Sequence, residues 1–180
     1  MIPCPINKTD YCLPDMIPCD NLANWNSYLN SLYPVFAREI RDSSLSFMGK
    51  PLKLRYEPWD GKFEHAFIHL THRDYFHTSD PNDRLPDPDR SERISWVNPI
   101  IQHYKCILNY NCSQILYWEQ RYRGYIRSNL LYKSERFLVV IEQRKNYCLL
   151  ITSYFLNEED SYNRKLRQYA KYQKQKTPLA

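Results

Sequence analysis

Three histidines, His65, His69 and His72, follow the pattern H-x-x-x-H-x-x-H. Histidine titrates near pH ~6.5, so a histidine beside a reacting group can accept or release a proton at neutral pH. Alternation predicts a strand over residues 62–72 with His65 and His69 on one face, whereas a helix would place all three histidines together. Ala66 stands where a zinc motif H-E-x-x-H has glutamate, so acid–base chemistry is favoured over a metal site. For each histidine, the structural alternative is a hydrogen bond inside the core.

Two arginines, Arg90 and Arg93, lie where a polar stretch, residues 73–92, gives way to a helix predicted over 91–104. A guanidinium at that place can bind a phosphate through two parallel hydrogen bonds. The alternative is an ion pair with an aspartate of the polar stretch. Both arginines are therefore candidate phosphate ligands.

A basic hairpin with the sequence R-Y-R-G-Y-I-R carries Arg121, Arg123 and Arg127 around Gly124. Arginine binds phosphates and tyrosine stacks on bases, so this alternation is typical of surfaces that bind single-stranded nucleic acid. No acidic residue interrupts the stretch. A binding role is therefore favoured over a hairpin that is merely exposed to solvent.

Two hydroxyl side chains, Thr152 and Tyr154, lie two residues apart in a strand predicted over 147–155, so they emerge on one face. Strict alternation adds Cys148 and Leu150 to that face. The opposite face is then apolar apart from one serine and is predicted to be core; it consists of Leu149, Ile151, Ser153 and Phe155. The hydroxyls of Thr152 and Tyr154 can then meet a substrate.

These residues require a framework of helices and strands to position them. Apolar spacing predicts a helix from Leu22 to Ile40, in which Pro34 causes a kink or starts a second helix. Pro99 poses the same choice in the helix over 91–104. Residues 51–57 predict a short strand. Four further runs, joined by turns too short for parallel crossovers, predict an antiparallel meander; they are 115–121, 125–132, 137–142 and 147–155.

The predicted fold class is α+β, with N-terminal helices packed on a four-stranded antiparallel β-meander and a basic C-terminal helix. The chain divides into an irregular and helical region (1–45), a core (46–160) and the basic helix with its tail (161–180).

The charge of the 180-residue chain is uneven, although its net value is +5. Residues 1–90 hold 10 Lys/Arg and 13 Asp/Glu, whereas residues 91–180 hold 15 and 7, a net charge of +8. A basic half favours a polyanionic partner. With 3 isolated glycines the chain cannot form a glycine-rich phosphate loop, and we predict no cofactor.

The 6 cysteines form no C-x-x-C pair. Cys4, Cys12 and Cys19 lie in a proline-rich N-terminal segment, at spacings that match no standard zinc motif. No signal peptide and no membrane span is recognisable. We therefore expect a cytoplasmic protein with reduced thiols and no membrane contact.

Short motifs over about residues 45–160 resemble the barnase, EndoU, colicin D and RelE (BECR) superfamily of ribonucleases, in particular its phage- and mobile-element-associated toxins. F-I-H-L-T (67–71) resembles their histidine motif, and R-S-E-R-I-S-W (90–96) their helix start. R-F-L-V-V-I-E followed by Y-C-L-L-I-T-S-Y resembles their last two strands.

The resemblance implies a metal-independent endoribonuclease, in which the 2′-hydroxyl attacks the neighbouring phosphorus and leaves a 2′,3′-cyclic phosphate. It implies His69 as the leading base or acid with His65 as its alternate, and Thr152 and Tyr154 as groups that orient the phosphate, with Tyr154 also a candidate proton donor. It also implies that Arg93, with Arg123 or Arg127, holds the phosphate in the catalytic site. The expected RNA-binding residues are Arg90, Arg121, Arg123 and Arg127. The expected partners are messenger or transfer RNA and an inhibitory antitoxin or immunity protein.

Two other classes of function are open at this point. A non-catalytic RNA- or DNA-binding regulatory module would use the same basic surface and would bind without cleavage. A metal hydrolase built on the histidines would lose its activity with a chelator.

Overall fold

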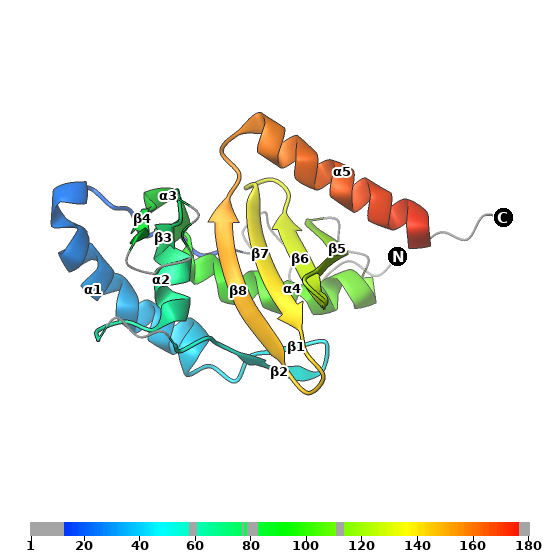
Figure 1. Ribbon diagram of the computed structural model, residues 1–180, viewed down its shortest axis with the longest axis horizontal. Helices are drawn as coiled ribbons and strands as arrows, with labels where there is room; N and C mark the ends of the chain where they lie inside the picture. Colours follow the sequence, from blue (N-terminus) through cyan, green and yellow to red (C-terminus); the bar gives the residue numbers. More distant parts are fainter. Residues whose placement is uncertain (1–12, 58–60, 77, 79–82, 111–113, 177–180) are drawn as a thin grey trace.

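The computed structural model describes residues 13–57, 61–76, 78, 83–110 and 114–176, and the fold is mixed α+β (Figure 1). Within these residues the main sheet has six strands in the order β1-β2-β8-β7-β6-β5. They are β1 (Ser46–Phe47), β2 (Lys50–Lys53), β5 (Ile115–Tyr122), β6 (Tyr125–Tyr132), β7 (Phe137–Gln143) and β8 (Cys148–Phe155). A smaller sheet pairs β3 (His72–Arg73) with β4 (Leu85–Pro86).

Helices precede, interrupt and follow the main sheet. A 3₁₀ turn at Leu22–Asn24 leads into α1 (Trp25–Phe36), which runs on into a π-helical turn at Ala37–Arg41. Pro34 therefore neither ends α1 nor starts a second helix. The other helices are α2 (His65–Thr71), α3 (Pro88–Ser91), α4 (Val97–Tyr110) and α5 (Glu159–Lys176).

The main sheet is not the four-stranded meander that the turn lengths predict. β5 to β8 pair antiparallel in chain order, but β2 joins the free edge of β8 in parallel, and β1 pairs with β2. The strand predicted over 51–57 forms only at Lys50–Lys53. β2 pairs with β8 at Cys148 and Leu149, and α2 contacts β8 as well.

Both faces of the sheet are covered. One face packs against α4 and α1 in the larger core cluster, which includes Leu32, Phe36, Ile100, Phe137 and Val139. The other face meets α5 in a smaller cluster that includes Trp118, Leu131, Leu138, Val140 and Tyr162. β7 lies between them and is buried along nearly its whole length. In Figure 1, α1, α2 and α3 lie to the left of β8, and α5 crosses the upper right.

The segment predicted as a strand over 62–72 forms α2 instead. Every residue of α2 except His69 is buried, so the alternation of residue types does not reflect one buried and one exposed face. Phe67 packs within 6 Å of the rings of Tyr33, Phe36 and Phe63. Periodicity cannot distinguish a short buried helix from a strand, and here tertiary packing decides.

The helix predicted over 91–104 is interrupted. α3 ends at Ser91, a 3₁₀ turn spans Ile94–Trp96 and α4 begins at Val97. Pro99 therefore lies in the first turn of α4, where a backbone N–H has no partner inside the helix and a proline is tolerated. No helix of the described residues is long and apolar enough to cross a membrane.

We expect the aromatic cluster beneath α2 to be a main source of stability. Phe67 is fully buried, so Phe67→Ala should lower the free energy of unfolding by about 3–5 kcal/mol in urea denaturation. Phe76, which is 65% exposed, provides the control: Phe76→Ala should change stability by less than about 0.5 kcal/mol. Similar losses in both variants would contradict this packing.

Candidate functional site

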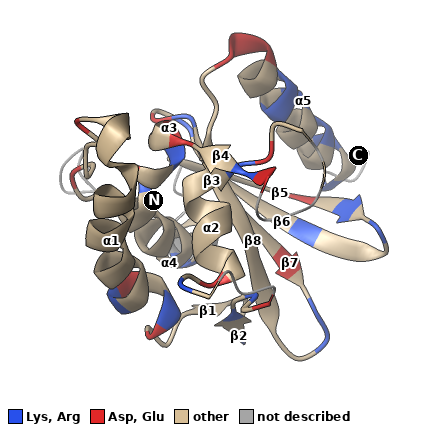
Figure 2. Ribbon diagram, turned by 60° about the vertical axis from the view of Figure 1, so that its left-hand side comes forward, with Lys and Arg blue, Asp and Glu red and all other residues tan. Residues whose placement is uncertain are grey.

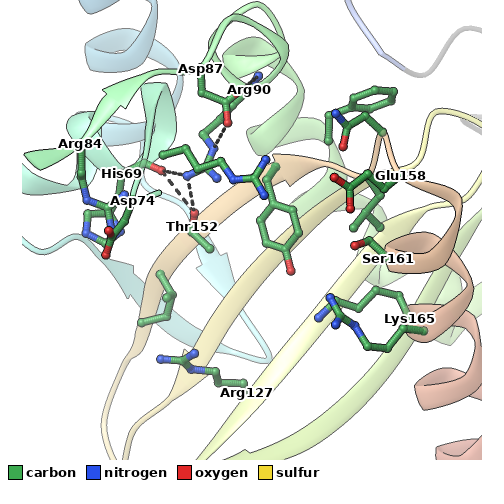
Figure 3. A pocket seen from close by; sticks show the side chains of 17 residues that line it. His69, Asp74, Arg84, Asp87, Arg90, Arg127, Thr152, Glu158, Ser161 and Lys165 are labelled. Atoms are coloured by element: carbon green, nitrogen blue, oxygen red, sulfur yellow. Dashed lines mark hydrogen bonds and ion pairs between the residues drawn. The ribbon is translucent and has the colours of Figure 1, made fainter. Parts of the chain in front are cut away.

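A pocket of about 410 Å³ opens between α2 and α3 on one side and α5 on the other, with β8 between them (Figure 3). This volume lies within the range of small-ligand sites. Five residues that the sequence singles out line it: His69, Arg90, Arg127, Thr152 and Tyr154. His65, Arg93, Arg121 and Arg123 do not.

Arg90 is the buried centre of one wall, with only 7% of its surface exposed. Its Nη1 donates to the carbonyl oxygens of His69 (2.8 Å) and His72 (2.9 Å) and to Thr152 Oγ1 (3.3 Å). Its Nε lies 3.4 Å from Asp87 Oδ2. The two carbonyls are at the C-terminal end of α2, where helix carbonyls lack partners and the helix dipole is negative. Arg90 thus joins α2 to α3 and β8.

Burial lowers the pKa of Arg90 to about 10, and the charge of Asp87 opposes this shift. A pKa of about 10 still leaves the guanidinium charged at neutral pH. The wall therefore carries a fixed positive charge, held in place by hydrogen bonds rather than by solvent.

β8 contains a β-bulge at Ile151. Thr152 pairs with Val140, but Leu150 pairs with Ile141, so Ile151 is the extra residue. A bulge of one residue reverses the faces on which the following side chains emerge. The second half of β8 is therefore out of phase with the first.

This bulge corrects the predicted faces of the last strand. Cys148 and Leu150 belong to the core on the α4 side, whereas Tyr154 packs against the opposite cluster and lines the pocket with Thr152. Ser153 is fully buried. Thr152 and Tyr154 do share a face, but the prediction that Cys148 and Leu150 share it with them is wrong.

Cations of two helices, α3 and α5, lie near the Tyr154 ring. The Arg90 Cζ atom is 5.7 Å and the Lys165 Nζ atom 6.0 Å from its ring centroid. None of the described residues forms a hydrogen bond with the Tyr154 hydroxyl. Thr152 Oγ1 lies 3.2 Å from the carbonyl oxygen of His69, so Thr152 positions the end of α2.

His65 and His69 are one helical turn apart on α2, and their ring centroids stack at 4.1 Å. Burial, then repulsion from Arg84, lowers the pKa of His69 to about 2. Burial, then repulsion from Arg55, lowers the pKa of His65 to about 4. Both rings are therefore neutral at pH 7, and His69 can act there as a proton acceptor but not as an imidazolium acid.

His72 is separated from the other two histidines and faces α1. Trp25 Nε1 donates to its Nε2 at 3.2 Å, and its Nδ1 lies 2.8 Å from Thr71 Oγ1. The structure therefore assigns His72 a packing role. Among the described residues, no group of three or more His, Cys, Asp or Glu could hold a metal ion. Cys4 and Cys12 lie outside the described residues.

Cationic side chains outnumber carboxylates in the pocket. Among the described residues, Arg73, Arg84, Arg90, Arg127, Arg164 and Lys165 line it together with Asp74, Asp87 and Glu158. Figure 2 shows Lys and Arg on α5 and beside α3, the two helices that flank the pocket. The pocket is thus suited to an anion.

Sequence reasoning did not assign Arg73, Arg84, Arg164 and Lys165 to the site. The last two lie on α5, within the C-terminal segment that the sequence predicts to be a basic helix, and its many Lys and Arg residues were the signal that could have found them. Arg84 comes from the polar stretch and donates to the His72 carbonyl oxygen at 3.3 Å. Its place beside His69 depends on the pairing of β3 with β4, which the sequence did not predict.

The three arginines of the basic hairpin do not act together. The turn has positive φ at Arg123 (47°) and Gly124 (83°), as in a type I′ turn. In this register Arg121 and Arg127 lie on opposite faces of the sheet. Only Arg127 reaches the pocket.

Arg127 is held on its face of the sheet by neighbouring side chains. Its Nε lies 3.3 Å from Glu142 Oε2, and its Cζ is 3.7 Å from the Tyr122 ring centroid. Arg144 pairs with the same carboxylate. Glu142 therefore fixes Arg127 and offsets part of its charge.

Arg93 is a packing residue. Its Cζ lies 5.3 Å from the Trp96 ring and 4.4 Å from the Phe155 ring, and Nη1 donates to the Asp89 carbonyl oxygen at 2.6 Å. Arg93 does not line the pocket itself, but it packs against Phe155, which does. Of the two arginines singled out at this helix start, Arg90 is the one at the site.

Comparisons with protein-family models, with curated proteins and with solved structures found no match.

We expect Arg90 to be required for the wall that it joins. Arg90→Ala leaves Asp87 without its buried cation and removes one donor from each of two carbonyls, and should lower the free energy of unfolding by about 3 kcal/mol. Arg90→Lys should recover only part of this loss, because an ammonium cannot reproduce the planar fork. The exposed Arg121 is the control, and Arg121→Ala should be neutral in the same urea denaturation. If Arg90→Ala were as stable as wild type in urea denaturation, Arg90 would not be required to hold this wall together.

His69 should make the protein less stable in mild acid. Its pKa is about 2 in the folded protein and near ~6.5 in the unfolded chain. Between these values only the unfolded chain binds the proton, so the free energy of unfolding falls as the pH drops below ~6.5. From pH 7.5 to pH 5 the loss through this residue should be on the order of 1–2 kcal/mol.

The measurement compares wild type with His69→Gln by urea denaturation at both pH values. The variant should lose less stability on acidification than wild type does. An identical pH dependence in the two proteins would show that His69 is not held neutral by burial.

Proposed function

We propose that the protein is a metal-independent endoribonuclease of the toxin or defence type, acting at the pocket between α2, α3 and α5. The observation that carries the proposal is the convergence of His69 and Tyr154 with an excess of cationic side chains in one pocket. Cleavage of an RNA phosphodiester needs such a set, because charge builds up on the phosphate while protons move. The sequence resemblance to BECR ribonucleases supports the same reaction and implies an inhibitory protein partner.

In the proposed reaction the 2′-hydroxyl attacks the adjacent phosphorus, and the bond to the 5′-oxygen of the next nucleotide breaks. His69 accepts the proton of the 2′-hydroxyl. Tyr154 donates a proton to the leaving 5′-oxygen. The products are a 2′,3′-cyclic phosphate and a free 5′-hydroxyl.

The charges of the pocket support this reaction in two ways. Arg84 and Arg127 face the non-bridging oxygens of the phosphate, while Arg90 acts as a positioning residue because the α2 carbonyls use its Nη1. A bound phosphate also places negative charge beside His69 and raises its pKa. The substrate thereby makes the imidazole a stronger base than it is in the empty pocket.

A non-catalytic RNA-binding module is the second candidate, and one observation favours it. Both stacked histidines have pKa values far below neutral pH, whereas catalytic groups usually titrate near the working pH. This candidate predicts binding to the same pocket without cleavage.

The test is incubation of the purified protein with total RNA in EDTA, followed by analysis of the fragment ends. We expect fragments with 2′,3′-cyclic phosphates. His69→Ala and Tyr154→Phe should each lower the cleavage rate by about two orders of magnitude, as expected for loss of a proton-transfer group. Arg123→Ala, outside the pocket, should cleave like wild type. RNA that is bound but uncut by folded wild-type protein would establish the second candidate.

A further inference from the structure

Five of the six cations that line the pocket form two groups on opposite walls. Arg73, Arg84 and Arg90 line the wall formed by β3, β4 and α3, whereas Arg164 and Lys165 line the wall formed by α5. In the close view of Figure 3, Arg84 and His69 lie on one side, and Ser161 and Lys165 on the other. One phosphate cannot neutralise both groups if it sits against either wall.

Each wall has an excess of one positive charge. The first combines its three arginines with Asp74 and Asp87. The second combines its two cations with Glu158 alone. A diester phosphate carries one negative charge, so one phosphate on each wall balances the charge of the two walls. Arg127, which belongs to neither wall, pairs with Glu142.

The surface between the walls is aromatic. The Tyr154 ring lies 5.7 Å from the Arg90 Cζ atom of one wall and 6.0 Å from the Lys165 Nζ atom of the other. An aromatic ring of this kind can stack on a base or pack against a ribose. The spacing therefore suits a nucleoside that lies over Tyr154 with a phosphate toward each side.

We propose that the pocket binds two consecutive phosphates of one single-stranded RNA, with the scissile phosphate on the Arg84 wall and the next phosphate on the Ser161–Lys165 wall. This inference rests on the proposed function, because it names the substrate of the same site. It makes α5 part of the binding site, not only a cover for the sheet. Arg164 and Lys165 then determine affinity without taking part in proton transfer.

The probes are adenosine 3′,5′-bisphosphate and the two adenosine monophosphates, titrated calorimetrically into the full-length protein. The bisphosphate should bind at least about tenfold more tightly than either monophosphate. The double variant Arg164→Ala/Lys165→Ala should remove this advantage and leave the affinity for the better-bound monophosphate within about twofold.

The matched control is Arg167→Ala/Lys171→Ala. Both residues are exposed on the same helix and do not line the pocket, so the pair removes the same charge. The control should keep the bisphosphate advantage. No advantage in the wild type, or equal effects of the two double variants, would overturn the proposal.

A further experiment distinguishes a single-stranded RNA ligand from a free nucleotide. A short single-stranded 2′-O-methyl RNA, which cannot be cleaved by 2′-hydroxyl attack, should compete with the bisphosphate. Failure to compete would assign the pocket to a small nucleotide and would contradict the binding of an RNA strand.

If the bisphosphate binds more tightly than the monophosphates and the RNA competes with it, but RNA is not cut, this inference stands and the proposed catalysis fails. If RNA is cut but the bisphosphate binds no more tightly than the monophosphates, the proposed catalysis stands and this inference fails.

Discussion

The buried guanidinium of Arg90 is the interaction on which the rest of the site depends. It satisfies two carbonyls at the end of α2, pairs with Asp87 at the start of α3 and contacts Thr152 on β8. Helix carbonyls at a buried C-terminus need donors, and Arg90 supplies one to both carbonyls, beside Thr152 at the His69 carbonyl and Arg84 at the His72 carbonyl. One side chain thereby sets the position of His69 relative to the strand that carries Tyr154.

Burial and the surrounding cations determine the chemistry of the pocket. Burial first, then repulsion from Arg84 and to a smaller extent from Arg90, lowers the pKa of His69 and keeps its imidazole neutral, and the cations also attract an anion into the pocket. These two effects are linked, because an anion in the pocket would offset the repulsion that the cations exert on a protonated His69. In the proposed reaction a bound phosphate thereby raises the basicity of His69, which favours the proton transfer.

The sequence predicts part of this arrangement, and the failures have physical causes. Turn lengths and alternation identify the runs that become β5 to β8, and the two-residue spacing of Thr152 and Tyr154 places them on one face. The extra residue Ile151 reverses the phase of that strand, and nothing in its residue type indicates a bulge. α2 is buried on nearly all sides, so its polarity pattern does not report its geometry. Arg84 reaches the site only through the pairing of β3 with β4, and such non-local pairing is not encoded in local periodicity.

Binding of RNA in the pocket between α2, α3 and α5 is tested most directly by amide chemical shifts of the isotope-labelled protein, recorded during titration with a single-stranded 2′-O-methyl RNA. We expect the largest changes at residues 69–73, 84–90, 151–157 and 161–165, the segments that surround the pocket. Changes confined to the hairpin tip around Arg123, with the pocket segments unaffected, would contradict it.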